Sequence, residues 1–332
     1  MNPLLAKLQP YPFEKLRALI AGNTPPAALR PINLQIGEPK HPTPALVKDA
    51  LAAALDGLAS YPLTAGTPEL RQAIATWLAR RYGIPQPDAE KQVLPVNGSR
   101  EALFAFAQTV LDPTREAKVV CPNPFYQIYE GAALLAGATP IYGAPESWAG
   151  VQLVYACSPA NPSGRVMRLE EWRELFELSE RHGFAIASDE CYSEIYCGEP
   201  PLGALQAAHR LGRSYDRLVA FSSLSKRSNA PGMRSGFVVG AGVAPIGFSG
   251  EETSRQHEHI VLAVQAAREL RVVDRRAHPQ IEAAVGHLGA QRLADHGQHG
   301  AVFLGVEPAV LLHMRLVAPR GYGGGLDREA HG

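Results

Sequence analysis

Short apolar runs alternate with helix-like stretches along the middle of the chain, and this alternation limits the folds open to it. The apolar runs read KQVLPV, AKVVCP, QLVYACSP, FAIASDE and RLVAFSS. Between them lie stretches with helical periodicity, such as SREALFAFAQTVL and RLEEWRELFELSERHG. Apolar strands separated by helices are typical of a mostly parallel sheet with helices on both faces. We therefore expect a large α/β domain.

Two further helices are predicted ahead of the first strand. One covers DALAAALDGLASYP, from about Asp49 until Pro62 halts it. The other covers TPELRQAIATWLARRYG, which opens at Thr67 and Pro68 and closes at Gly83.

The charge balance and the apolar pattern narrow the class of partner. The chain has 32 basic and 32 acidic residues, so no net field draws it to nucleic acid or to an anionic membrane. Charged residues such as Lys7 and Glu14 interrupt the opening stretch, which is unlike a signal peptide. No run reaches the about 18 apolar residues of a membrane helix. We expect a cytoplasmic protein that acts on a small molecule.

The cysteines are predicted to be reduced structural residues. Cys121, Cys157, Cys191 and Cys197 form no CxxC pair, and none has a histidine at metal-ligand spacing. The sequence therefore predicts neither a metal site nor a disulfide framework.

The polar residues that are suited to chemistry follow the apolar runs. In parallel sheets, ligands collect at the carboxyl ends of the strands. The residues at these ends are Asn97 to Arg100, Asn161, Asp189, and Ser223 to Lys226. We therefore predict a ligand site along this edge.

Lys226 is the candidate nucleophile. It follows a buried strand and is flanked by hydroxyls, Arg227 and Arg234. Burial and neighbouring cations both lower the pKa of an amine and free its lone pair for attack on a carbonyl. A solvated loop lysine is the alternative for any single lysine, and the surrounding residues favour the nucleophile.

Asp189 ends an apolar strand, where an unpaired carboxylate is costly and needs a cationic partner. A protonated pyridine nitrogen would serve, whereas the alternative is a cap for the next helix. Tyr192 and Asn161 could both reach a phenolic oxygen on the same ring, although Asn161 fits an Asn-Pro turn equally well. Tyr126 could lie flat on the ring or could serve only in packing.

The stretch VNGSREALFAF passes from a strand into a helix near Ser99. Free amides at the start of the helix, its dipole and Arg100 would make a phosphate seat, while simple helix capping is the alternative.

Taken in order, seven segments resemble the class I/II aminotransferases, the fold-type I group of pyridoxal 5'-phosphate (PLP) enzymes. They are IGEPKHPTP, YPLTAGTPELR, NGSREAL, NPFYQIYEGAALLAG, SPANPSG, SDECYSEIY and SLSKRSNAPGMRSGF. The sequences of these segments are most similar to those of bacterial succinyldiaminopimelate aminotransferases. The resemblance covers roughly Met1 to Gly240. It is specific because Asp-x-x-Tyr, Ser-x-x-Lys and an arginine eight residues after that lysine occur in order.

The resemblance implies the fold and the cofactor. It implies PLP and a large domain at residues 36–240, with a mostly parallel seven-stranded sheet flanked by helices. Residues 1–35 would form an N-terminal arm and part of a small domain. Residues 241–332 would form an atypical or disrupted C-terminal small domain.

The resemblance also implies roles for individual residues. Lys226 would bind PLP covalently and shuttle the proton, and Asp189 would pair with the pyridine nitrogen. Asn161 and Tyr192 would hold the ring hydroxyl, and Tyr126 would stack on the ring. The phosphate would be held by Gly98, Ser99, Arg100, Ser223 and Arg234.

Two implied roles concern the substrate and a second subunit. Gly37 lies where the substrate carboxylate passes, and Asn161 also faces the substrate. Tyr61 matches the tyrosine that reaches the phosphate of the neighbouring subunit, which implies a homodimer with shared active sites.

The implied reaction moves an amino group between glutamate and a 2-oxo acid. The resemblance to succinyldiaminopimelate aminotransferases implies N-succinyl-LL-2,6-diaminopimelate as the product, in lysine and diaminopimelate biosynthesis. Two alternatives remain: a PLP-dependent β-lyase, because the same electron sink serves elimination, and a catalytically impaired remnant that at most binds PLP.

The sequence departs from the family pattern in two places. Only Gly143 to Val151 connect GATPIY to the next strand, where family members have a longer loop. Beyond Gly240 the resemblance is lost, and that tail holds eight of the eleven histidines and no lysine. This jump suggests out-of-frame translation of a GC-rich gene, with an ordinary divergent domain as the alternative. The arginine for the substrate carboxylate stays unassigned between His313 and Arg315.

Overall fold

The computed structural model describes residues 2–30, 32 and 36–241. The chain divides into two compact units, Met1–Lys48 with Leu63–Ala277, and Asp49–Pro62 with His278–Gly332. The predictions for residues 242–332, including out-of-frame translation and the choice between His313 and Arg315, lie outside the described residues. The expected domain boundaries at residues 35 and 240 stay predictions.

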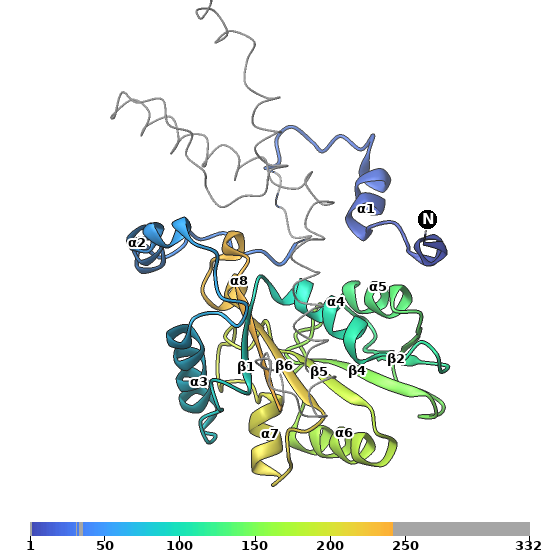
Figure 1. Cartoon of the computed structure of the whole chain (residues 1–332). Coiled ribbons are helices and arrows are strands. Elements are labelled where there is room, and N and C mark those ends of the chain that lie inside the picture. Colours follow the sequence, from blue (N-terminus) through green and yellow to red (C-terminus); the bar gives the residue numbers. More distant parts are fainter. Residues whose placement is uncertain (1, 31, 33–35, 242–332) are drawn as a thin grey trace, which may run out of the picture. The chain divides into compact units, whose positions relative to one another are not determined.

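A seven-stranded sheet forms the centre of the first unit (Figure 1). Its strands are β1 (Val93–Val96), β2 (Lys118–Cys121), β3 (Thr139–Tyr142), β4 (Val151–Cys157), β5 (Ala185–Asp189), β6 (Leu218–Ser223) and β7 (Gly236–Gly240). They lie in the order β1-β7-β6-β5-β4-β2-β3. Only β7 runs antiparallel to its neighbours, β1 and β6. The prediction of a mostly parallel seven-stranded sheet in an α/β fold is confirmed.

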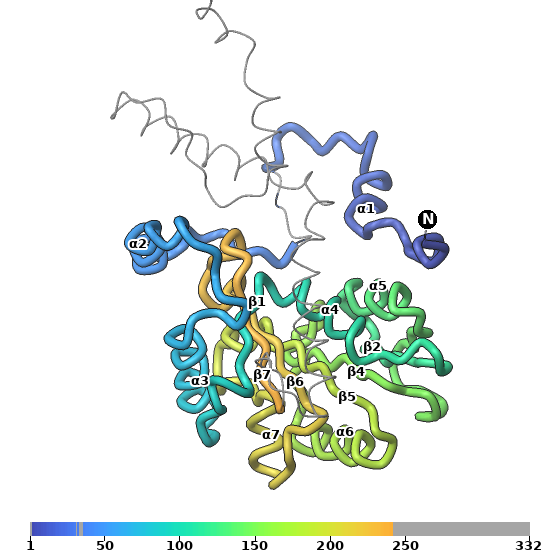
Figure 2. The backbone as a smooth tube through the Cα atoms, in the orientation of Figure 1, coloured from blue at the N-terminus to red at the C-terminus, as the bar shows by residue number. Residues whose placement is uncertain are grey.

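Figure 2 shows how the last strand of the sheet enters it: β7 lies between β1 and β6, although β1 comes far earlier in the chain. This insertion brings the segment just before β7 beside the segment that follows β1. Arg234 and Gly98 are therefore neighbours in space.

Helices cover both faces of the sheet, as the alternation predicts. The helices that precede, connect or follow the strands of the sheet are α3 (Pro68–Tyr82), α4 (Ser99–Val110), α5 (Ile128–Leu135), α6 (Leu169–His182), α7 (Ala204–Arg210) and α8 (Leu224–Arg227). The shorter elements and those nearer the N-terminus are η1 (Pro3–Lys7), α1 (Pro12–Ile20), α2 (Ala45–Ala53), η2 (Leu55–Ala59) and η3 (Pro231–Met233). Among the described residues, none of the helices has the length and apolarity that a membrane crossing needs.

Neighbouring residues of one strand join different halves of the core, because successive side chains of a strand point to opposite faces. Val93 packs in the cluster of α3, α6 and α7, which contains the fully buried Trp172. Leu94 packs in the cluster of α4 and α5, which contains the fully buried Tyr129. The sheet thus has a hydrophobic core cluster on each of its faces.

The predicted helix at residues 67–83 has the expected ends. The Thr67 side chain accepts a hydrogen bond from the Leu70 amide at 3.3 Å, and Gly83 closes α3 with a φ of 60°. The helix predicted from Asp49 was placed wrongly. It begins at Ala45, because Pro44 suits a helix start, and after Ala53 the chain continues as the 3₁₀ helix η2.

The ends of three parallel strands are aligned. Cys157 of β4 pairs in register with Asp189 of β5, and Asp189 pairs with Phe221 of β6. Cys121 and Cys157 end their strands as buried thiols, as predicted. The aligned ends place the polar residues that follow these strands at one edge.

Candidate active site

The carboxyl edge of β4, β5 and β6 carries the polar residues singled out in the sequence. Asp189 is the last residue of β5, and Ser223 is the last residue of β6. Asn161 follows β4, and Lys226 lies on α8, directly after β6. One edge of the sheet therefore presents a carboxylate, a hydroxyl, an amide and an amine.

Asp189 is buried, with 5% of its surface exposed. The Tyr129 hydroxyl donates to its Oδ2 at 2.6 Å, and the Cys191 backbone amide donates to its Oδ1 at 3.1 Å. The second contact caps the turn after β5, whereas the alternative predicted for this carboxylate was the cap of a following helix. Because both oxygens are held by donors, the orientation of the carboxylate is fixed.

Tyr129 was missed by the sequence reasoning. It lies on α5, and its ring stacks on Tyr155 with centroids 4.4 Å apart and an interplanar angle of 13°. Burial, and next the charge of Asp189, raise the pKa of Tyr129, so its hydroxyl stays protonated and acts as a donor. The available signal was its spacing of three residues from Tyr126, which places both rings near one side of the same turn.

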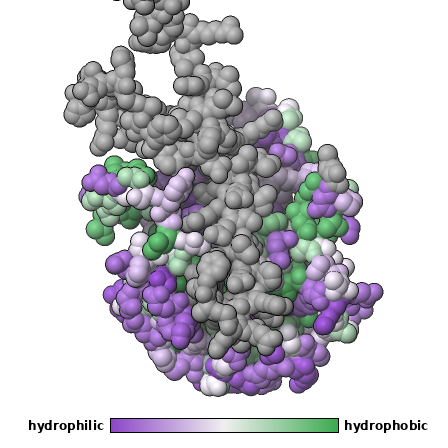
Figure 3. Space-filling view, viewed as in Figure 1, coloured by the Kyte–Doolittle hydropathy of each residue, from purple (hydrophilic) through white to green (hydrophobic). Residues whose placement is uncertain are grey.

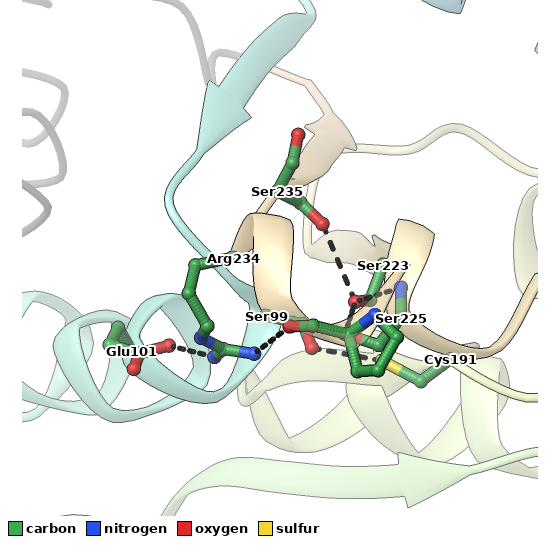
Figure 4. A network of polar contacts seen from close by, with 8 residues as sticks. Ser99, Glu101, Cys191, Ser223, Ser225, Arg234 and Ser235 are labelled. Carbon is green, nitrogen blue, oxygen red and sulfur yellow. Dashed lines mark hydrogen bonds and ion pairs between the residues drawn. The ribbon is translucent and has the colours of Figure 1, made fainter. Parts of the chain in front are cut away.

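A second group of residues lies where α4 begins (Figure 4). The N-cap residue Gly98 has a φ of 113°, and a Cβ atom there would lie 2.5 Å from both Arg234 and Glu101. Arg234 Nη2 forms an ion pair with Glu101 Oε2 at 2.9 Å. Ser99 Oγ lies 2.9 Å from Cys191 Sγ. Glycine is favoured here by the positive φ, and a Cβ would also displace the ends of the Arg234 and Glu101 side chains.

Hydroxyls from the end of β6 lie beside this group in Figure 4. The Ser225 amide donates to Ser223 Oγ at 3.1 Å, and the two hydroxyls are 2.9 Å apart. Ser223 Oγ also donates to the Ser235 carbonyl at 3.4 Å. Ser225 lies within the predicted range Ser223 to Lys226, although the sequence analysis gave it no role of its own.

This set of donors has the chemistry of a phosphate seat. Free amides at a helix start, guanidinium groups and hydroxyls all favour a bound anion. At Gly98, the space that a Cβ would fill is taken by the ends of the Arg234 and Glu101 side chains, which brings the guanidinium up to the start of α4. With the buried carboxylate of Asp189 and the amine of Lys226 along the same edge, the residues present fit PLP.

Lys226 is half-buried, and its Nζ lies 6.0 Å from the centre of the Tyr192 ring. Burial lowers the pKa of the Lys226 amine, the nearby Glu38 carboxylate opposes this, and the Arg234 charge adds to the lowering. Burial likewise raises the pKa of Tyr192 to about 12, so the phenol remains a donor. A Cβ on Gly37 would lie 3.5 Å from the Tyr192 hydroxyl, so its main chain passes beside this tyrosine.

Three further residues predicted for the site are Asn161, Tyr126 and Tyr61. The backbone N–H of Asn161 donates to Cys157 Sγ at 3.4 Å. Burial raises the pKa of Tyr126, and the Arg100 charge opposes this in part. Tyr61 belongs to the second unit, and its side chain is fully exposed.

The known proteins that this chain resembles are named as transaminases or aminotransferases. The chain is 40% identical over 216 residues to 4-dedimethylamino-4-oxo-anhydrotetracycline transaminase OxyQ of Streptomyces rimosus, which covers 63% of this chain and 58% of that protein. It is 30% identical over 272 residues to LL-diaminopimelate aminotransferase 2 of Trichormus variabilis, covering 75% of this chain and 67% of the relative. The chain thus spans less than two thirds of the Streptomyces protein.

A solved structure of an aminotransferase from Neisseria meningitidis superposes with a TM-score of 0.71. It is 48% identical, and the match covers 81% of this chain and 76% of that one. None of these three proteins is named a succinyldiaminopimelate aminotransferase, so that finer resemblance stays a prediction. Residues 30–246 match the model of the family described as aminotransferase class I and II. This chain therefore belongs to the class I and II aminotransferases, a family whose cofactor is PLP.

Proposed function

We propose that this chain is a PLP-dependent aminotransferase in which Lys226 holds the cofactor and moves the substrate proton. The observation that carries the proposal is the shared edge at which the Lys226 amine, the buried Asp189 carboxylate and the anion seat at α4 lie. Family membership supports the same activity.

When bound, PLP supplies an electron sink for the substrate's α-carbon. The role of Asp189 is to oppose a positive charge on the ring nitrogen, and Tyr129 keeps the carboxylate oriented for this. Tyr192 and Asn161 donate to the ring oxygen. Lys226 has a lowered pKa, so its Nζ can accept a proton and return it.

The phosphate is held where α4 begins, and Tyr126 packs against the ring. The ligands proposed for the phosphate are Gly98, Ser99, Arg100, Ser223 and Arg234. Glu101 already pairs with Arg234, so a phosphate would compete with this carboxylate for the guanidinium. Gly37 offers its main chain to the substrate carboxylate.

The proposed donor is glutamate, and the proposed acceptor is the oxo acid that gives N-succinyl-LL-2,6-diaminopimelate. Relatives named LL-diaminopimelate aminotransferase, at 30% identity in Trichormus variabilis and 32% in Aquifex aeolicus, support an acceptor of this general type. Comparing rates with the succinylated and free oxo acids would decide which form is used.

We also propose a homodimer in which Tyr61 reaches the neighbouring subunit's phosphate. Tyr61 is fully exposed, and it follows a stretch from α2 to η2 whose leucines are exposed as well, which appears as an apolar surface in Figure 3. Mixing Lys226→Ala protein with Tyr61→Ala protein should restore activity, because hybrid dimers would hold one intact site. A mixture that stays as inactive as its parts contradicts shared sites.

The test of the activity is the absorbance spectrum of the PLP-loaded protein before and after glutamate is added. Glutamate should convert the cofactor to its amino form, and a 2-oxo acid should reverse the change. Lys226→Ala is the control that should respond in neither direction. An unchanged spectrum with glutamate, together with release of ammonia from a β-substituted amino acid, would contradict transamination and favour the lyase.

A further inference from the structure

Asn229 connects the region of Lys226 to a segment far away in the sequence. Its Nδ2 donates to the His41 carbonyl at 2.7 Å and to the Pro42 carbonyl at 3.0 Å. Its own carbonyl accepts from Thr43 Oγ1 at 2.8 Å. Three hydrogen bonds thus fasten residues 41–43 to the turn that follows α8.

The fastened segment, residues 36–43, runs beside the candidate active site, and we call it the strap. Gly37 of the strap lies beside the Tyr192 hydroxyl. Glu38 forms an ion pair with Lys40 at 2.8 Å and acts electrostatically on Lys226. The strap thus contributes both main chain and charge to the surroundings of the amine.

The strap buries few of its side chains. Most of its residues are exposed, and only Pro39 and Thr43 are partly buried. A segment that buries few apolar side chains depends on its hydrogen bonds for a fixed position. The three bonds at Asn229 therefore help to determine where the strap, with Gly37 and Glu38, lies.

Asparagine suits position 229 for two separate reasons. The residue has a φ of 49°, a conformation that glycine and asparagine adopt more readily than other residues. Asparagine also supplies two N–H donors, which glycine does not have. The backbone conformation and the fastening of the strap can therefore be separated by substitution.

We propose that Asn229 is a positioning residue that fastens the strap beside Lys226, so that the strap's main chain meets the substrate in a fixed place. Its substitution should weaken substrate binding more than it slows the later proton transfer. The kinetic part of this proposal rests on the proposed aminotransferase activity, whereas the fastening itself does not.

The test uses Asn229→Gly in the full PLP-loaded chain, because glycine keeps the backbone conformation and removes the side-chain bonds. Trypsin cleavage between Lys40 and His41, followed by mass spectrometry, should speed up about tenfold, which corresponds to the loss of two modest hydrogen bonds. The KM for glutamate should rise several-fold while kcat changes less. Thr43→Val, which loses only the third bond, should show a smaller increase in cleavage.

Cleavage of both variants at the wild-type rate would overturn the fastening. Faster cleavage with an unchanged KM and a reduced kcat would overturn the role in substrate binding. If the wild-type protein has no aminotransferase activity but both variants are cleaved faster, the proposed function fails and the fastening stands.

Discussion

The Tyr129 hydroxyl donates to Asp189 Oδ2 at 2.6 Å, and this bond joins α5 to the carboxyl end of β5. Tyr129 has no exposed surface, and Asp189 has 5%. A buried carboxylate that accepts two donors keeps one orientation, whereas one that loses a donor retains the cost of burial without the compensation. The geometry of Asp189 therefore depends on Tyr129, which lies in the segment NPFYQIYEGAALLAG but was given no role in the sequence analysis.

Replacing Tyr129 by Phe should lower both stability and cofactor affinity. The loss of a hydrogen bond to a buried charged group costs about 2 kcal/mol. Thermal unfolding would measure the first effect, and titration with PLP would measure the second. We expect the dissociation constant of PLP to rise about tenfold or more, because Asp189 is no longer held toward the ring.

Tyr155→Phe is the matched control for this variant. Tyr155 is buried in the same stack, but its hydroxyl donates to the Leu103 carbonyl at 2.8 Å and not to Asp189. We expect a stability loss of about 1 kcal/mol and nearly unchanged PLP affinity. Equal effects of the two variants on affinity would contradict a specific role of Tyr129.

Gly98→Ala should abolish tight PLP binding. The added Cβ would lie 2.5 Å from the Arg234 guanidinium, and the φ of 113° is strained for alanine. Gly183→Ala is the control, since Gly183 has a φ of 81° and open space where a Cβ would lie. Gly183→Ala should lose about 1 kcal/mol of stability because its backbone is left-handed helical, and Gly98→Ala should lose more, because φ 113° with ψ 138° is a conformation that is essentially restricted to glycine. Only Gly98→Ala should lose affinity for PLP in equilibrium titration.

Lys226 should react with an amine-labelling reagent at lower pH than an ordinary lysine, whose pKa is 10.5. Burial lowers the pKa of Lys226, so in the PLP-free protein the neutral, reactive amine forms as pH rises through that lowered value. Labelling followed by peptide mass spectrometry gives the midpoint of the profile.

Two neutralising variants should move this midpoint in opposite directions. Glu38 raises the pKa of Lys226 and Arg234 lowers it. Glu38→Gln should therefore shift the midpoint down, and Arg234→Gln should shift it up. Shifts in the same direction would contradict the described placement of these charges around the amine.

Much of the fold could be predicted because it depends on local patterns. The alternation of apolar runs and helices gave the parallel sheet, and Thr67 and Gly83 marked the ends of α3. The early start of α2 was missed because Pro44 was not weighed as a helix start. The insertion of β7 between β1 and β6 depends on pairing between distant segments, which periodicity does not encode.

In the candidate site too, the features that follow from local patterns could be predicted, and the contacts between distant segments could not. The strand ends indicated where Asp189 and Lys226 would lie, because parallel strands bring their carboxyl ends to one edge. The contacts from Tyr129 to Asp189 and from Asn229 to residues 41–43 join positions 60 and more than 180 residues apart. Such contacts arise from packing, and the chain carries no local signal that pairs them.

The most direct test of the role of Lys226 is to find which residue binds PLP. The PLP-loaded protein is reduced with borohydride, digested and mapped by mass spectrometry. We predict that the cofactor is trapped on the peptide that contains Lys226, and that Lys226→Arg protein traps none. Trapping on another lysine, or an even spread over several exposed lysines, would contradict the proposed site.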